Sequence, residues 1–218
     1  MNKVLVVAVH PDDETLGCGG TLLRHKAEGD EINWLICTEL NVKHPMKNLR
    51  EEEISKVSKM YGFDSVHQLG LETMRVDEYS MSELVEKFSI IFNKVKPTIV
   101  YFPFKSDIHS DHRKVFEAAY SCTKSFRYPF LKKILMMETL SETEFAPSLK
   151  EDALVPNVFI DVESYLAQKI EIMRVFESEI GAFPFPRSIK NIEALATLRG
   201  ATSGCEHAES FMLLKEIR

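Results

Sequence analysis

Residues 3–14 of the chain are KVLVVAVHPDDE, an apolar run followed at once by a polar one. The valine-rich part, residues 3–9, predicts a strand that is buried on both faces. His10 starts the polar part, in which a proline and two aspartates end the strand and form a turn. The segment therefore predicts a strand of a parallel sheet with imidazole and carboxylate groups at its carboxyl end.

Expected strands and helices alternate along the rest of the chain. Strands, the last of them a strand or an extended tail, are expected at residues 3–9, 31–38, 65–70, 98–102, 133–138, 157–160 and 210–217. Helices are expected at residues 21–27, 47–61, 80–95, 111–124, 162–178 and 188–200. This alternation predicts an α/β fold, Rossmann-like, with a mostly parallel sheet and helices on both faces. The less regular second half predicts a smaller C-terminal extension. No repeat or linker interrupts the chain, so we expect a single domain over residues 1–218.

Three glycines follow the first polar segment, at positions 17, 19 and 20. They resemble a nucleotide-binding turn, but the G-x-G-x-x-G spacing is absent and the polar residues come before the glycines. We therefore expect the helix to begin at Thr21. The glycines are expected to allow close backbone packing beside the site.

The composition excludes several classes of partner. The net charge is −6 and no run of Lys and Arg is present, so we expect no nucleic acid to bind. No segment approaches the roughly 18–20 apolar residues of a membrane span. The short apolar run at 4–9 lacks a cleavage site, so we expect no signal peptide and a cytoplasmic location. The four cysteines have no C-x-x-C spacing and are expected to be free thiols.

A second polar cluster, DIHSDH at residues 107–112, follows the expected strand at 98–102. Ligands of open parallel sheets bind beyond the carboxyl ends of the strands, so the two clusters face each other if their strands are neighbours. Two imidazoles and one carboxylate suit a catalytic zinc with an open position for water, and the same ligands accept iron(II). A further carboxylate beside the metal can accept a proton from the attacking water.

Each cluster alone has a simpler explanation. A His-Pro pair at a strand end is often only a turn, and consecutive acidic residues often complement a helix dipole. Several imidazole and carboxylate groups at two strand ends are hard to explain in this way. The remaining histidines have no partner at a suitable spacing and are expected to be ordinary core or surface residues: His25, His44, His67 and His207.

Taken together, these motifs resemble those of the LmbE-like, or PIG-L, deacetylases. Residues 8–20, AVHPDDETLGCGG, are similar to the opening signature of the family, and residues 107–113 to its second metal motif. Arg50-x-x-Glu53 fits its second helix, and RGxxxGxxxAExF at 199–211 fits its C-terminal motif. The resemblance covers nearly the whole chain. It implies a metal-dependent hydrolase that removes an acetyl group from a small N-acetylated amino sugar.

The resemblance also implies a metal centre. His10, Asp13 and His112 would bind Zn²⁺, with Fe²⁺ as an alternative ion. Asp111 would orient a histidine of this centre, as metal sites usually require. The implied partner is a small-molecule sugar, with no nucleic acid and no membrane span, and the formation of homo-oligomers is left open.

Further roles follow from the same resemblance. Asp12 would be the general base, and His109 would stabilise the developing oxyanion or protonate the leaving amine. Arg50 would reach hydroxyl groups of the substrate. Arg199 and Glu209 would line or brace the pocket, with an internal salt bridge as the alternative.

The motifs specify the reaction and leave the substrate open. Ser110 stands where many relatives have proline, but this change does not touch a ligand. Loops 139–156 and 181–187 match no subgroup and are expected to shape the mouth of the pocket. Two alternatives therefore stay open: a metal-dependent amidase that acts on a non-sugar or antibiotic N-acyl group, and a non-catalytic Rossmann-like binding module.

Overall fold

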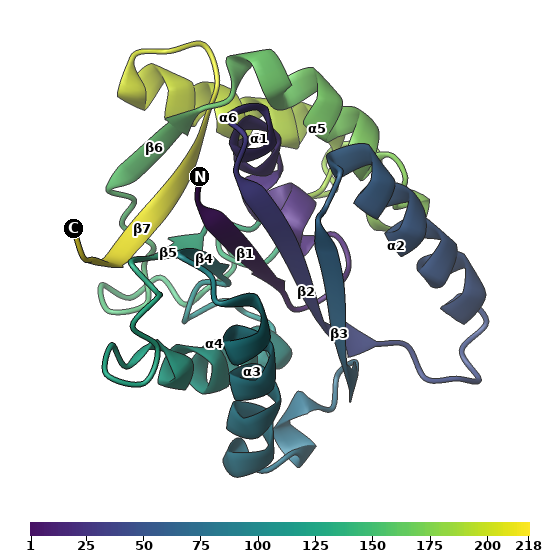
Figure 1. The fold of residues 1–218 in the computed structure, drawn as a ribbon. Coiled ribbons are helices and arrows are strands. Elements are labelled where there is room, and N and C mark those ends of the chain that lie inside the picture. Colours follow the sequence, from purple (N-terminus) through teal and green to yellow (C-terminus); the bar gives the residue numbers. More distant parts are fainter.

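The first strand, β1 (Lys3–Ala8), lies inside a seven-stranded sheet, as its lack of a polar face requires (Figure 1). The computed structural model describes residues 1–218. Its other strands are β2 (Glu31–Glu39), β3 (Ser65–Glu72), β4 (Ile99–Phe102), β5 (Lys133–Met137), β6 (Val158–Asp161) and β7 (Ala208–Glu216). All seven expected strands are therefore present.

The strand order across the sheet is β3-β2-β1-β4-β5-β7-β6. β1 pairs in parallel with both β2 and β4, so the direction of strand addition reverses between β1 and β4. β7 runs antiparallel to both of its neighbours, β5 and β6. The predicted α/β fold with a mostly parallel sheet is confirmed. The C-terminal part adds β7 and β6 to one edge of this sheet.

Helices cover both faces of the sheet (Figure 1). One layer contains α1 (Asp13–Ala27), α2 (Lys47–Tyr61), α5 (Leu166–Met173) and α6 (Ile189–Ser203), and the other contains α3 (Met81–Val95) and α4 (Ser110–Tyr120). Successive side chains of β1 alternate between the two layers: Val4 and Val6 pack in the first core, and Leu5 and Val7 in the second. Both faces of β1 are thus apolar because both are covered.

Helix α1 begins at Asp13, so the expected start at Thr21 is wrong. The glycines at 17, 19 and 20 lie inside the helix, where glycine is usually unfavourable by about 1 kcal/mol relative to alanine. The helix bends at Cys18, which has a non-helical φ of −150°. The glycines are used for packing here and do not form a turn.

Two of these glycines show why α1 needs them. A Cβ atom at Gly17 would lie 2.9 Å from the Cβ of Met137 on β5. A Cβ atom at Gly20 would lie 2.7 Å from the Cβ of Val162. Helix α1 therefore approaches its neighbours more closely than any residue with a side chain permits, and this packing outweighs the low helix propensity of glycine.

The helix expected at 162–178 is shorter in the structure. Helix α5 covers only its middle, and short 3₁₀ turns flank it at Glu163–Tyr165 and Glu177–Glu179. Phe176 leaves the helical conformation, with ψ at 66°, and its side chain is fully buried. Burial of this ring therefore outweighs continuation of the helix.

Helix α6 is longer than the expected 188–200, because Gly200 does not end it. A Cβ atom at Gly200 would lie 2.4 Å from the carbonyl oxygen of Glu206, so glycine is needed there for packing. The helix ends at Gly204, which has the left-handed φ of 80° typical of a helix C-terminus. Helix α4 is close to expectation but gives way to a 3₁₀ turn after Tyr120.

The two polar clusters lie at neighbouring strand ends. β1 and β4 pair in register from Val4 with Ile99 to Val6 with Tyr101, so both strands leave the sheet at the same edge. This confirms the neighbour relation on which the predicted site depends. None of the helices combines the length and the apolar character needed to cross a membrane.

We expect Gly20→Ala to lower the free energy of unfolding by about 1–3 kcal/mol, because the new methyl group overpacks against Val162. Urea denaturation of Gly20→Ala, Val162→Ala and the double variant measures this. The double variant should be less destabilised than the sum of the single variants, since Val162→Ala removes the two Cγ atoms of the clash and leaves only the Cβ atom. A Gly20→Ala protein that is more stable than the parent would contradict the close approach.

Candidate metal centre

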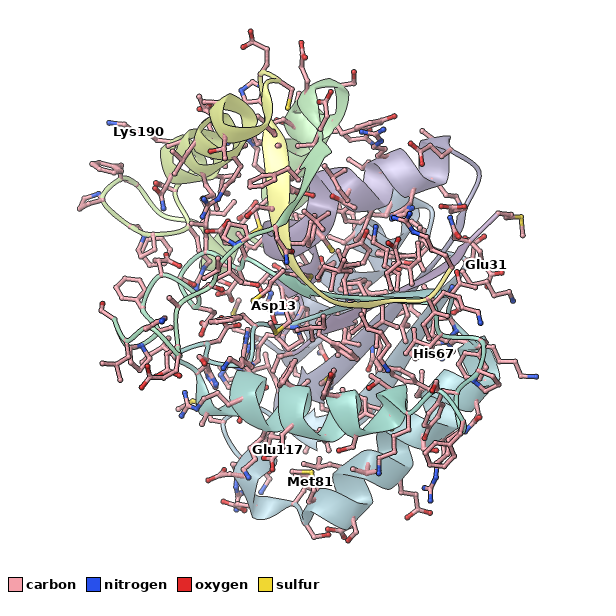
Figure 2. All side chains as sticks on the ribbon, turned by 90° about the vertical axis from the view of Figure 1, so that its left-hand side faces the viewer. Asp13, Glu31, His67, Met81, Glu117 and Lys190 are labelled. Atoms are coloured by element: carbon pink, nitrogen blue, oxygen red, sulfur yellow. The ribbon has the colours of Figure 1, made fainter.

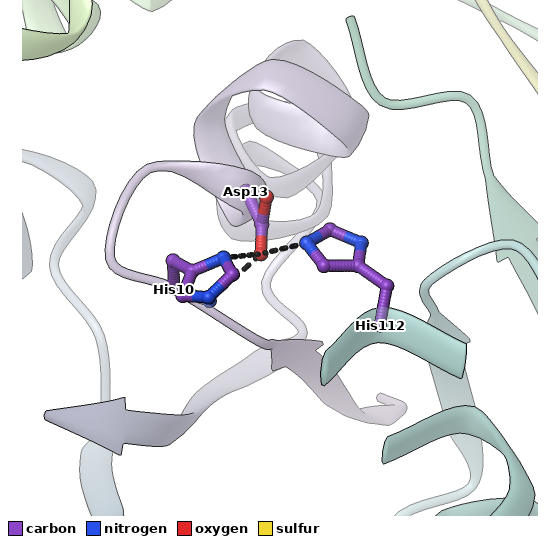
Figure 3. A group of neighbouring side chains, drawn as sticks. All are labelled: His10, Asp13 and His112. Carbon is purple, nitrogen blue, oxygen red and sulfur yellow. Dashed lines mark hydrogen bonds and ion pairs between the residues drawn. The ribbon is translucent and has the colours of Figure 1, made fainter. Parts of the chain in front are cut away.

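Three side chains from the two strand ends converge on one point (Figure 3). Oδ2 of Asp13 lies 3.9 Å from Nδ1 of His10 and 3.3 Å from Nε2 of His112. The same oxygen accepts a hydrogen bond of 2.8 Å from the backbone N–H of His10. In Figure 2, Asp13 lies in the interior of the molecule, whereas Lys190 extends from its surface. The structure therefore brings together the three residues that the sequence nominated as metal ligands.

The orientation of His112 leaves one nitrogen free for a cation. Its Nδ1 donates a hydrogen bond of 2.9 Å to Oδ2 of Asp107, and Oδ1 of Asp107 accepts one of 2.7 Å from the hydroxyl of Thr143. Nε2 is buried and has no hydrogen-bond partner. A histidine whose second nitrogen is held by a carboxylate is the usual arrangement at a metal site. The donor set and the orphaned Nε2 therefore fit a divalent metal ion.

The charge around His112 supports the same conclusion. Burial disfavours its imidazolium form, but Asp13 and Asp107 outweigh this effect and raise its pKa to about 9. The carboxylates thus stabilise a positive charge at the point where Asp13 and the histidines meet, and a bound cation supplies such a charge.

Asp111 contacts the other histidine of the cluster. Its Oδ2 lies 3.4 Å from Nε2 of His10 and accepts a hydrogen bond of 2.7 Å from the backbone N–H of Met74. Its Oδ1 accepts a longer bond, of 3.3 Å, from the N–H of Val76. These bonds, together with His10 nearby, hold the pKa of this carboxyl below its usual range although burial opposes them. Asp111 is thus a fixed anion beside His10, but Asp107, which sequence reasoning missed, holds His112.

Asp12 lies at the start of α1 in a strained backbone conformation. Its φ is 140°, a value that residues with a side chain rarely adopt. Its carbonyl accepts bonds from Thr15 and Leu16, and its N–H donates to Oε2 of Glu14 at 3.1 Å. Burial, followed by the charges of Asp13 and other nearby carboxylates, raises the pKa of Asp12 well above its usual range. The raised pKa makes its carboxylate a stronger base for a proton transfer than an exposed aspartate.

His109 lies at the N-terminus of α4 with its ring centre 4.7 Å from that of His10. Its Nδ1 accepts a bond of 3.1 Å from the backbone N–H of Asp111, so in the neutral ring Nε2 carries the hydrogen. Burial, assisted by His10, lowers the pKa of His109. The neutral ring is therefore favoured over the imidazolium. Its Nε2–H can still donate a hydrogen bond to a developing oxyanion.

A cavity of about 250 Å³ opens beside these groups. Besides the two clusters it is lined by side chains from the end of β2, from α2, from β3 and the residues after it, from the loops at 139–156 and 181–187 and from the 3₁₀ turn at 177–179, among them Glu39, Lys47, Arg50, Glu51, Gln68, Thr73, Ser141, Glu142, Glu179 and Arg187. The two loops thus border the cavity, as expected. Few of the lining residues are apolar, which suits a hydroxyl-rich ligand.

Arg50 lines the cavity but is held by protein groups. Its Nη1 lies 3.3 Å from Oε2 of Glu53 and donates to the carbonyl of Pro11 at 3.3 Å. Its Nη2 pairs with Glu179, and the guanidinium lies over the ring of Phe176 at 5.4 Å. Arg50 therefore supports the wall next to the polar turn, and only part of it faces the cavity.

Glu179 and Arg187 are wall residues that the sequence did not reveal. Nη2 of Arg187 donates to Oε2 of Glu179 at 3.0 Å, and Nε donates to the backbone carbonyl of the same residue at 2.7 Å. Nη1 donates to Ser141 at 2.7 Å. The two residues lie in segments without periodicity, so no pattern marked them.

Arg199 and Glu209 do not line this cavity. Arg199 pairs with Glu138. Glu209 accepts bonds from the backbone of Gly20 and Thr21 and from Nζ of Lys169, the last at 2.7 Å. Both therefore form the internal ion pairs that the sequence left as the alternative: Arg199 links α6 to the residue after β5, and Glu209 links β7 to α5.

The geometry agrees with a known family. The chain matches the family model "PIG-L: GlcNAc-PI de-N-acetylase" over residues 5–123. The chain belongs to this family. The match includes both polar clusters and the strands that carry them.

Relatives and solved structures extend the similarity to the rest of the chain. Over 238 aligned positions, the chain is 23% identical to the diacetylchitobiose deacetylase of Thermococcus kodakarensis, covering 100% of this chain and 85% of that protein. It is 22% identical to the probable N-acetyl-α-D-glucosaminyl L-malate deacetylase 2 of Bacillus anthracis, covering 81% and 80% respectively. The fold is similar to that of the conserved protein TT1542 from Thermus thermophilus, with a TM-score of 0.81, 24% identity, and coverage of 100% and 97%.

We expect Asp107→Asn to weaken zinc binding by about 10–100-fold, because an amide cannot accept bonds from both His112 and Thr143. Isothermal titration of the metal-free protein with zinc measures the affinity. Asp77→Asn, at an exposed position, is the matched control. Thermal melts followed by circular dichroism separate an effect on the site from a loss of fold. Unchanged zinc affinity in a folded Asp107→Asn protein would rule out this role.

Proposed function

We propose that the protein is a zinc-dependent hydrolase that removes the acetyl group from an N-acetylated amino sugar. The observation that carries the proposal is the convergence of His10, Asp13 and His112 beside Asp12 in a polar cavity. Membership of the PIG-L family and similarity to deacetylases of acetylated amino sugars support an N-deacetylase. The released products are acetate and a free amine.

In this proposal His10, Asp13 and His112 hold the metal ion. A divalent cation at that point supplies positive charge that polarises the acetamide carbonyl and makes a nearby water more acidic. Zinc suits two imidazoles and one carboxylate, and iron(II) is the alternative because it accepts the same ligands. Asp107 contacts the ring of His112, and Asp111 contacts the ring of His10, so both aspartates orient these imidazoles.

The protein groups around the metal centre have separate roles in proton transfer, oxyanion stabilisation and substrate binding. Asp12 accepts a proton from the attacking water, for which its raised pKa makes it a suitable base. Nε2–H of His109 donates a hydrogen bond to the acetamide oxygen as negative charge develops there. Asp12 returns its proton to the nitrogen when the C–N bond breaks. Arg50 meets a sugar hydroxyl from the cavity wall.

The alternatives are less favoured. The deacetylases of N-acetylated amino sugars among its relatives favour a sugar substrate over an antibiotic or another N-acyl compound. A non-catalytic binding module does not require a strained, buried Asp12 with a raised pKa next to a cluster that fits a cation.

We expect the zinc-loaded protein to release acetate from N-acetylglucosamine glycosides and not from N-acetylated amino acids. An enzyme-coupled acetate assay measures this. Removal of the metal with a chelator should abolish the activity, and addition of zinc or of iron(II) under anaerobic conditions identifies the ion that restores it. Full activity in protein shown by elemental analysis to be metal-free would refute the metal-dependent part of the proposal.

We expect Asp12→Ala to lower kcat by about 10²–10⁴-fold while zinc remains bound in stoichiometric amount, because this variant loses the base but no ligand. Single-substrate kinetics and elemental analysis of the same preparation test both statements. Asp77→Asn again serves as the control for a lost surface carboxylate. Near-normal turnover of Asp12→Ala would show that another group takes the proton.

A further inference from the structure

The wall of the cavity formed by the start of α2 and the end of β2 carries a lysine paired with two carboxylates. Lys47 reaches this wall from the first turn of α2. Its Nζ lies 2.7 Å from Oε2 of Glu39 and 3.0 Å from Oε1 of Glu51. Burial lowers the pKa of Lys47, but the bonds to these two carboxylates outweigh it and raise the pKa overall. The lysine is therefore a charged group that two anions already neutralise.

The other cationic residues of the cavity are neutralised in the same way. Arg50 pairs with Glu53 and Glu179. Arg187 pairs with Glu179. No lysine or arginine of the cavity is thus left without a carboxylate partner, and a carboxylate or phosphate on the substrate has no unpaired side-chain cation to bind.

Counting the lining residues leads to the same conclusion. Six carboxylic residues line the cavity, namely Asp12, Asp13, Glu39, Glu51, Glu142 and Glu179, against the three basic residues Lys47, Arg50 and Arg187. With Asp12 protonated, a divalent ion bound by Asp13 would keep one positive charge, so the lining as a whole would be about neutral. The group of Lys47, Glu39 and Glu51 carries one net negative charge, which disfavours an anionic group next to this wall.

The same wall suits neutral hydroxyl groups. One oxygen each of Glu39 and Glu51 binds Lys47, and the second oxygen of each forms no hydrogen bond in the structure. Gln68 adds an amide to the same side of the cavity. Free carboxylate oxygens accept hydrogen bonds from sugar hydroxyls, and such charge-assisted bonds are strong.

From this arrangement we propose that Glu39 and Glu51 make the enzyme selective for N-acetylated amino sugars with a neutral remainder, such as a second sugar or an alkyl glycoside. Sugars that carry a carboxylate or phosphate next to the acetylated ring are rejected. This inference rests on the proposed deacetylase function and specifies its substrate class. It distinguishes the chain from a relative whose name specifies a malate conjugate.

The test compares kcat/KM for acetate release from N,N′-diacetylchitobiose and from N-acetylglucosamine 1-phosphate. The parent protein should prefer the neutral substrate by about tenfold or more. The variant Glu39→Gln/Glu51→Gln leaves Lys47 as an unpaired cation, so it should reduce this preference by a similar factor. Adding Lys47→Met to that variant removes the unpaired cation, so it should cancel the increase in kcat/KM for N-acetylglucosamine 1-phosphate.

Glu117→Gln is the matched control, because Glu117 forms an exposed pair with Lys114 and does not line the cavity. It should leave the ratio of the two kcat/KM values unchanged. A parent protein that favours the phosphate, or a ratio that does not respond to Glu39→Gln/Glu51→Gln, would overturn the selectivity and leave the deacetylase function intact. Absence of acetate from either substrate and from the other N-acetylated sugars would overturn both.

Discussion

The parallel pairing of β1 with β4 is the constraint on which the site depends. Hydrogen bonds hold the two strands in register, so the segments that follow them leave the sheet at the same edge and at the same level along the strands. The polar turn after β1 supplies His10 and Asp13, and the first turn of α4 supplies His112. Candidate metal ligands that are far apart in the sequence therefore lie side by side at the point where the strand order reverses.

Fixed negative charge is the second organising feature of the site. Asp13 is held by a backbone N–H, Asp111 by two, and Asp107 by His112 and Thr143. These bonds orient the carboxylates before any ligand arrives, so little reorganisation is needed when a cation binds. Asp12, the residue before α1, has a rare backbone conformation beside the same cluster, with a φ of 140°.

The walls of the cavity and its centre are formed by different elements of the fold. The centre comes from two strand ends and two helix starts, whereas the walls come from α2, β3 and the loops near Ser141 and Arg187. Ion pairs in these walls, such as Lys47 with Glu39, set the charge of the cavity wall. A family with one chemistry can thus vary its substrates by changing wall residues and leaving the centre intact.

The sequence by itself determined the class of fold and the ligand candidates. A valine run without a polar face requires burial on both sides, and imidazole and carboxylate groups directly after a strand must lie at the edge of the sheet. Only the tertiary structure decided that α1 begins at Asp13, because close packing against Met137 and Val162 overrides the propensity of glycine. It also decided that Asp107 holds His112 and that Arg199 and Glu209 form internal pairs, since these outcomes depend on side-chain directions and on contacts between distant segments. Local patterns report which face of an element is buried, but they carry no information on which charged group will find which partner across the fold.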